Sequence, residues 1–198
     1  MATPPALGPP TRRRRRAPEA RRVILDAAQK RLTEGGPEAV RLQDVARDVG
    51  ISHPAVLHHF GSREGLLQAL EQRAMANLQA DLLAARNSDH ALERVATTLG
   101  EQGHARLLAW WALRGGPEAA SEPHEHMLSE LADALAAEEP GGSREDIEFS
   151  IRLIAAAMLG EALLGPTLSR SAGLPQDEAS PRFRRRLAAL ATTLMSGR

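Results

Sequence analysis

Histidines have the greatest capacity for chemistry near neutral pH in this sequence, and three of its seven stand close together. His53, His58 and His59 lie in the stretch ISHPAVLHHFGSREGLL, residues 51–67. Imidazole can bind a metal ion, transfer a proton, or hydrogen-bond a base edge or a phosphate. A zinc site needs ligands that converge on one point, and on a helix a spacing of four residues achieves this. Because no two of the three have that spacing, the cluster favours recognition over metal binding, although His59 could instead only pack beside Phe60.

A second group of candidate ligands lies in the stretch EPHEHM, residues 122–127. Glu122, His126 and Glu130 would share one stripe of a helix at intervals of four residues. Such a stripe either holds a metal ion or forms a solvated face, and a solvated face is the more common outcome. We therefore predict no metal site and no cofactor.

Catalytic motifs are missing from the sequence. It contains no G-x-S-x-G turn, no P-loop and no metal-ligand helix motif of the H-E-x-x-H kind. Cysteine is absent, which excludes disulfides, thiolate zinc sites and cysteine nucleophiles. Ser and His occur together, but without the features that would activate them. An enzyme is therefore the less favoured class of function, and we predict no catalytic residue.

The elements that carry these residues are expected to be helices. Apolar residues recur at helical spacing, no run alternates with period two for long enough to form a strand, and glycines and prolines separate the periodic segments. We predict an all-α chain of about nine helices. Expected segments are a helix from residue 21 to the Gly-Gly-Pro at 35–37, then 42–49, 53–60, a long helix after Ser62, 91–101, 104–114, 124–138, 145–164 and 181–195.

Residues 42–60 have the pattern of two short helices joined by a sharp turn. Ala46 is small enough for a following helix to pass close by, and Gly50 can adopt the left-handed conformation that such a turn requires. Apolar residues around them would hold the two helices at a steep angle; they are Val45, Val49, Ile51 and Val56. This is a helix-turn-helix, whose second helix can enter a DNA major groove.

At this point the chain resembles a known family. The segments ILDAAQKRL (24–32), LQDVARDVGIS (42–52) and HHFGSREGLL (58–67) are similar to the N-terminal domain of the tetracycline-repressor (TetR) family of transcriptional regulators. The resemblance covers roughly residues 21–70 and implies an N-terminal three-helix helix-turn-helix domain followed by a larger C-terminal helical domain for ligand binding and dimerisation. The implied boundaries are 1–20 for a disordered basic arm, 21–67 for the DNA-binding domain and 68–198 for the remainder.

The resemblance also implies roles for individual residues. Phe60 would fill the three-helix core, while the recognition helix and the starts of its neighbours would meet DNA. Three positions depart from the family pattern. Leu57 stands where an aromatic residue is usual, and Arg31 stands where an apolar residue is usual. The pair His53-Pro54 stands where a basic residue and a glycine are usual. The implied contacts to bases and phosphates are Arg41, Gln43, Ser52, His53, Ala55, His58 and Arg63.

Charge is distributed unevenly along a chain whose formal net charge is zero. Residues 1–62 carry 11 Lys and Arg against 6 Asp and Glu, whereas residues 63–198 carry 14 against 19. A basic first third is typical of a segment that meets a polyanion. Arg14, Arg15 and Arg16, within the run Arg12–Arg16, would either follow the minor groove beside the recognition helix or add unspecific electrostatic attraction.

The C-terminal part has the features of a dimer interface and of a ligand pocket. Apolar residues lie on two faces of the segment 145–164, and a further apolar stripe lies along 183–194; a partner copy would cover them, unless both belong to an internal core. The resemblance implies a four-helix interface. Bulky residues between these segments would line a pocket for a small apolar or aromatic ligand, or would be plain core. They are His104, Trp110, Trp111, Met127 and Met158.

Together these patterns predict a homodimeric repressor that binds double-stranded DNA at a palindromic operator and is released by a small-molecule effector. The alternative is a DNA-binding or architectural protein whose core binds no ligand. No segment approaches the roughly 18 apolar residues of a membrane span, and the charged N-terminus lacks the apolar core of a secretory signal. We therefore expect no membrane contact and a cytoplasmic location.

Overall fold

The computed structural model describes residues 12–84, 88–115, 126–138 and 143–195. Within these ranges the regular elements are helices and no strand occurs, which confirms the all-α prediction. None of the helices there is long and apolar enough to cross a membrane. The elements are α1 (Arg12–Gly35), η1 (Pro37–Ala39), α2 (Leu42–Val49), α3 (His53–Phe60), α4 (Arg63–Ala84), α5 (Ser88–Ala96), η2 (Thr97–Glu101), α6 (His104–Gly115), α7 (Met127–Glu138), α8 (Arg144–Ser171) and α9 (Gln176–Met195).

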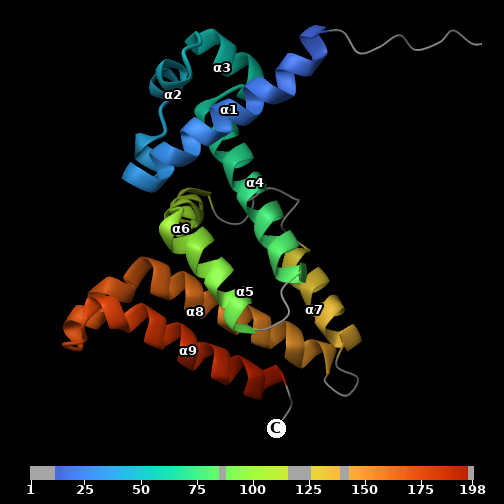
Figure 1. Ribbon diagram of the computed structural model, residues 1–198, viewed down its shortest axis with the longest axis vertical. Helices are drawn as coiled ribbons and strands as arrows, with labels where there is room; N and C mark the ends of the chain where they lie inside the picture. The colour runs from blue at the N-terminus through green and yellow to red at the C-terminus, as the bar shows by residue number, and fades with distance from the viewer. Residues whose placement is uncertain (1–11, 85–87, 116–125, 139–142, 196–198) are drawn as a thin grey trace, which may run out of the picture.

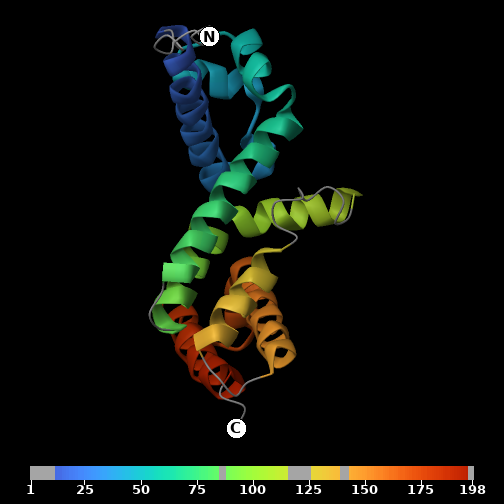
Figure 2. The ribbon, with the colours of Figure 1, turned by 90° about the vertical axis from the view of Figure 1, so that its right-hand side faces the viewer.

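The molecule is elongated, and α4 runs through its middle, from the N-terminal helices toward α7 (Figure 1). Helices α1, α2 and α3 pack together around the first turns of α4 at one end. At the other end α8 packs along α9, while α7 packs on α8 and α5 on α9. Helix α6 lies between the two ends and projects sideways from α4, as Figure 2 shows after a quarter turn. The helix-turn-helix is thus held away from α8 and α9 by the long helix α4.

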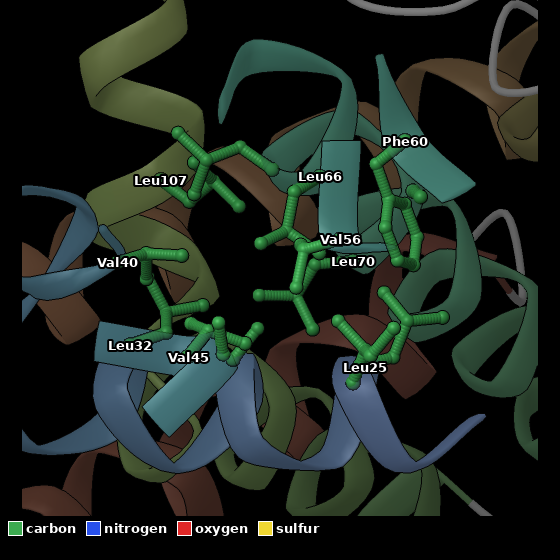
Figure 3. Close-up of a cluster of buried hydrophobic side chains, with 14 residues drawn as sticks. Leu25, Leu32, Val40, Val45, Val56, Phe60, Leu66, Leu70 and Leu107 are labelled. Carbon is green, nitrogen blue, oxygen red and sulfur yellow. The ribbon is translucent and has the colours of Figure 1, made fainter. Parts of the chain in front are cut away.

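One buried cluster holds the N-terminal end together (Figure 3). Helix α1 contributes Ile24, Ala28 and Leu32 at intervals of four residues, each of them fully buried. Helices α2, α3 and α4 each add apolar side chains, and Phe60 of α3 has 9% of its surface exposed at the edge of the cluster. Leu107 of α6, also fully buried, completes it. The first four helices therefore share their core with a residue from beyond the expected boundary at 67, which itself falls inside α4.

Helix α1 begins earlier than the sequence pattern predicted. It starts at Arg12 rather than Arg21, so the prediction of disorder is wrong for residues 12–20; residues 1–11 lie outside the described ranges. Residues 17–19 are exposed, and an exposed stretch of helix needs no apolar periodicity. The Arg, Ala and Glu residues of this segment have high helix propensity even with Pro18 among them. The Arg22 guanidinium also bonds the carboxylates of Glu19 at 2.7 Å and Asp26 at 3.1 Å, pairings that support a helical backbone.

The C-terminal end is built from three smaller clusters. One joins α5, η2, α6, α8 and α9 around Met158, one joins α4, α5 and α7 around Met75, and one joins α7 and α8 around Ile151. Helix α8 continues to Ser171 through Pro166, and α9 begins at Gln176, so both are longer than predicted. Several large apolar side chains on these two helices remain exposed: Phe149, Leu153, Leu164, Leu168 and Leu190.

Candidate nucleic-acid interface

The turn between α2 and α3 depends on Gly50. Its φ of 73° and ψ of 31° lie in the left-handed region, where a side chain would be strained. Its N–H donates to the Arg47 carbonyl at 3.2 Å, and the Ile51 N–H donates to the Ala46 carbonyl at 3.0 Å. These two bonds form a Schellman motif, which ends α2 and redirects the chain. Residues 42–60 are therefore two helices at an angle, as predicted, and not one continuous helix.

Helix α3 has a buried face and an outward face. Val56 and Phe60 point into the N-terminal cluster, with 0% and 9% of their surfaces exposed. On the other side of the helix lie the exposed His58 and the half-buried Ala55, while the exposed Ser52 and the half-buried His53 stand at its start. Ser52 is the N-cap residue, but its side chain makes no capping hydrogen bond. The outward face thus offers a hydroxyl, two imidazoles and a methyl group to a partner.

The end of α3 is fixed to α1 through Arg21. The Arg21 Nη1 donates to the His59 carbonyl at 2.9 Å, and the guanidinium lies 4.4 Å from the centre of the Phe60 ring. His59 is half-buried, and its ring is tilted to that of Phe60 with 6.3 Å between the ring centres. This agrees with the alternative that His59 only packs beside Phe60. Across the described part of the chain, no three His, Asp or Glu residues are placed to hold a metal ion.

An open groove of about 350 Å³ lies beside α3, at the starts of α2 and α4. Four residues predicted to meet DNA line it together: Arg41, Gln43, His53 and Arg63, with Leu42 and Asp44. Arg41 is the N-cap residue of α2, and the side chains of Arg41 and Gln43 are both exposed. Phosphate oxygens are bound by such arginine and amide side chains and by free N–H groups at a helix start. The groove and the outward face of α3 therefore form one surface that suits the backbone and bases of duplex DNA.

Comparisons with known proteins agree with this geometry. Residues 24–70 match the family model described as "Bacterial regulatory proteins, tetR family". The HTH-type transcriptional repressor Rv3405c of Mycobacterium tuberculosis is 28% identical over 184 residues, which cover 89% of each chain. Residues 24–70 are therefore a DNA-binding domain of the TetR family, and most of the chain is similar to a regulator that carries such a domain.

Other relatives match over a shorter length or in fold alone. The regulator BetI of Rhizobium meliloti is 34% identical over 103 residues, 48% of this chain and half of that protein. A transcriptional regulator from Rhodococcus sp. Rha1 superposes with a TM-score of 0.65 at 20% identity, over 90% of this chain and 97% of that one. A point variant of TetR from Acinetobacter baumannii AYE, in complex with minocycline, gives a TM-score of 0.61 at 21% identity, over 86% and 93%. These structures share the fold of the whole regulator.

Arg31 is one of the departures from the family pattern, and the structure gives it a partner. Its Nε and Nη2 donate to the two carboxylate oxygens of Asp48, at 2.6 and 2.8 Å. The paired geometry matches the fork of a guanidinium to a carboxylate and lowers the pKa of Asp48, chiefly through the hydrogen bond. An ion pair between α1 and α2 thus occupies a position where an apolar residue is usual.

Arg63 lies in the groove but its guanidinium is turned toward the protein. Its Nε donates to the Val40 carbonyl at 2.9 Å, and its Nη2 bonds the Pro37 carbonyl. Its guanidinium carbon lies 5.3 Å from the centre of the Trp110 ring of α6. The side chain is 26% exposed. Arg63 therefore lines the groove and also contacts α6.

The five residues predicted to line a ligand pocket do not lie together. Trp110 and Trp111 pack against the N-terminal cluster. His104 is fully buried, and its Nε2 lies 2.9 Å from Oε1 of Gln29 in α1. Met127 packs with the cluster around Met75, and Met158 lies in the cluster of α5, α8 and α9. The structure thus places the first three residues at the junction with the DNA-binding helices and only the two methionines in the C-terminal core.

The junction of α4 and α6 contains a buried carboxyl group that was not among the predicted site residues. Glu71 has 4% of its surface exposed, and burial raises its pKa to about 7, while the nearby Trp111 indole opposes part of this shift. Burial, together with the charge of Arg73, lowers the pKa of His104 to about 4. The sequence carried a signal for Glu71, because it lies four residues after Leu67 and four before Met75, on the buried stripe of α4.

Two buried nitrogens at this junction make no hydrogen bond of normal geometry within the described ranges, although one of them, on the Trp111 indole, lies close enough to the Glu71 carboxyl to lower its pKa. They are Nδ1 of His104 and Nε1 of Trp111. The Gln29 Nε2 donates to the Gln102 carbonyl at 2.9 Å, so its Oε1 is left to accept from His104. His104 is then the neutral tautomer with a proton on Nε2 and a lone pair on Nδ1. The contact between the DNA-binding helices and α6 consequently includes buried polar groups as well as the apolar Leu107.

Proposed function

We propose that this TetR-family regulator is a homodimeric repressor that binds a palindromic operator and is released by a small apolar or aromatic ligand. The observation that carries the proposal is the outward face of α3, which a closed core holds beside a groove with phosphate-binding side chains. The relative Rv3405c is named a repressor and matches along most of both chains. A protein that controls genes acts where the chromosome lies, which supports a cytoplasmic location.

In the proposed complex α3 enters the major groove. His53, Ala55 and His58 would meet base edges, since imidazole can donate or accept a hydrogen bond and a methyl group fits against thymine. Ser52, Arg41 and Gln43 would bind the flanking phosphates. Arg14, Arg15 and Arg16 lie in the first turns of α1, where they would add electrostatic affinity or reach the minor groove.

Dimerisation would explain the exposed apolar side chains of α8 and α9. Phe149 and Leu153 are 65% and 44% exposed, and Leu164 and Leu168 are 56% and 60% exposed. Each pair stands four residues apart, on one side of α8, and the exposed Leu190 lies on α9. A second copy would remove these groups from water in a four-helix interface. It would also present two α3 helices, which need a separation of roughly 34–36 Å to fit successive major grooves.

The effector would bind among the C-terminal clusters. Met127 and Met158 are candidate contacts there, because methionine adapts to irregular apolar ligands. A ligand at this place would move α4 and so change the separation of the recognition helices. Two proteins of the same fold are named with ligands, the Acinetobacter baumannii TetR variant with minocycline and the multidrug binding protein EbrR with imidazole. His104, Trp110 and Trp111 are better placed to transmit such a change than to touch the ligand.

The test is selection of DNA sequences by the purified protein from a random library, followed by titration of the selected site. We expect a palindromic site that is bound at nanomolar concentration. Leu164→Glu with Leu168→Glu, two exposed positions, should leave the fold intact, produce a monomer in sedimentation, and weaken operator binding at least ~30-fold, because two half-sites are no longer held together.

A wild-type protein that selects no sequence, or a double variant that stays dimeric, would contradict the proposal. A panel of apolar compounds then tests release. Compounds that raise the melting temperature should also lower operator affinity. If the operator is bound but no compound has either effect, the protein is a DNA-binding protein without a ligand.

A further inference from the structure

We propose that Arg63 is a positioning residue that links α6 to the DNA-facing start of α2, and that its principal role is not to contact phosphate. The proposal rests on the DNA-binding part of the proposed function and requires no effector. It concerns the juxtaposition of Trp110, Arg63 and the carbonyl groups of Pro37 and Val40.

The first step of the argument is what Arg63 holds. The two carbonyls that it bonds belong to the short connection between α1 and α2, immediately before Arg41, the N-cap of α2. The fork of a guanidinium can satisfy two acceptors at once in a fixed direction, which a lysine ammonium cannot do in the same way. Arg63 therefore sets where α2 starts, and with it the positions of Arg41 and Gln43 on the groove.

The second step is what holds Arg63. The half-buried Trp110 ring lies beside its guanidinium at 5.3 Å and makes an edge contact with Trp111 at 4.8 Å. Trp110 packs, together with Leu107, against the N-terminal cluster. A cation over an indole face is attracted by the ring quadrupole, and this attraction adds to the two hydrogen bonds. The third nitrogen, Nη1, lies 3.8 Å from a carboxylate oxygen of Glu64, so a phosphate that used Nε or Nη2 would have to displace a carbonyl.

The third step is the second attachment of α6. At its other end Arg106 Nη2 donates to the Thr33 carbonyl at 2.9 Å, and the Gln102 carbonyl just before α6 accepts from Gln29 at 2.9 Å. Helix α6 is thus fixed to the last turns of α1 at one end and to Arg63 further along. A displacement of α6 would be carried to both ends of the connection that leads into α2.

The experiment measures operator affinity and its salt dependence for Arg63→Lys and Trp110→Leu. A phosphate contact contributes about one unit to the slope of log K against log salt, and lysine would keep most of it. A positioning residue gives a different pattern. We expect about tenfold weaker binding for R63K and about fivefold for W110L, with both slopes unchanged, although Trp110 would never touch DNA.

Two further measurements separate positioning from a general loss of structure. The double variant should bind no more weakly than R63K alone, because both changes break one linkage. Amide exchange at residues 37–45 should accelerate in both single variants while the melting temperature of the whole protein changes little. Trp110→Phe keeps an aromatic face and should restore most of the affinity that W110L loses.

The matched control is Arg114→Ala. The Arg114 guanidinium lies 4.5 Å from the same Trp110 ring and its side chain is exposed at the far end of α6, away from the carbonyls that Arg63 bonds. Its removal should leave operator affinity unchanged. The proposal is overturned if W110L binds like wild type, or if Arg63→Ala lowers the salt slope by one while residues 37–45 keep their protection. A wild-type protein that binds no operator would instead contradict the proposed function.

Discussion

The two ends of the regulator differ in how completely each one buries its own apolar surface. At the N-terminal end a single cluster takes in α1 to α4 and Leu107 of α6, with Trp110 and Trp111 packed against it, and its large apolar side chains are nearly all inside. At the C-terminal end the same kind of residue is divided among three smaller clusters, and five large apolar side chains on α8 and α9 face water. The N-terminal end thus buries its apolar side chains within one chain, whereas the C-terminal end leaves on its surface the apolar side chains that the proposed dimer would cover.

The junction between these ends differs from both. It buries Glu71, His104 and the Trp111 indole, and it joins α1 to α6 through hydrogen bonds. Buried polar groups hold a specific arrangement when they are satisfied and are costly when they are not. A polar junction between two apolar cores can therefore favour a small set of defined relative positions of the two ends.

The largest expected effect comes from two phenylalanines that test the comparison directly. Phe60→Ala should destabilise the protein by about 3–5 kcal/mol, because it leaves a cavity in the closed core. Phe149→Ala, at a position 65% exposed, should change the free energy of unfolding by less than ~0.5 kcal/mol. Denaturant unfolding measures both in the monomeric L164E/L168E background, and equal losses would refute the distinction between the two ends.

The next effect concerns the pH dependence of the junction. The pKa of Glu71 rises from 4.5 to about 7 on folding, so the folded protein binds a proton that the unfolded chain releases in this range. The contribution of Glu71 is therefore present below pH 4.5 and is lost as the pH rises through 7. Relative to Glu71→Gln, the wild type should lose about 2–3 kcal/mol of stability between pH 5 and pH 8.

Unfolding curves at pH 5, 6, 7 and 8 for both proteins test this expectation. His104 acts in the opposite sense, because its lowered pKa removes stability as the pH falls from 6.5 through 4. The Glu71→Gln variant should therefore become more stable as the pH rises to 6.5 and change little above it. Parallel pH profiles for the two proteins would show that Glu71 is not buried as an acid.

The smallest effect compares two glycines around which an added methyl group meets nothing within 4 Å. Gly50 has a φ of 73°, so Gly50→Ala should cost about 1 kcal/mol through backbone strain. Gly160 lies within α8 without a positive φ, and Gly160→Ala should stabilise the monomeric variant by about 0.5–1 kcal/mol. Thermal unfolding measures both, and a gain at Gly50 would show that the turn tolerates a side chain.

Much of the N-terminal end could be predicted from sequence because its signals are local. Gly50 ends α2, Ser52 begins α3, and the Ser62 hydroxyl accepts from the Gly65 N–H at 2.9 Å at the start of α4. The apolar residues of α4 that the pattern turned inward, such as Leu66 and Leu70, are fully buried. Helix α1 was predicted too short, since Pro18 and the lack of an apolar stripe before Arg21 obscured its first turns.

The sites depended on contacts that no local pattern contains. Which helix packs against which decides that Trp110 and Trp111 join the N-terminal cluster while Met158 joins the C-terminal one. Arg63 had the right position for a phosphate contact, but nothing near it in sequence indicated that Trp110 of α6 would be its neighbour. Glu71 is the exception, because its place on the apolar stripe of α4 is visible in the spacing of Leu67, Glu71 and Met75 alone.

Leu107 makes the core of the N-terminal end depend on α6. A fragment that stopped after α4 would lack the side chain that completes its interior and would expose a hole lined by leucines and valines. A chimera that joins this N-terminal domain to the C-terminal domain of another regulator would therefore need an apolar side chain at the position of Leu107. Domain exchange between such proteins is thus constrained by Leu107, which belongs to the C-terminal part by sequence and to the N-terminal core by packing.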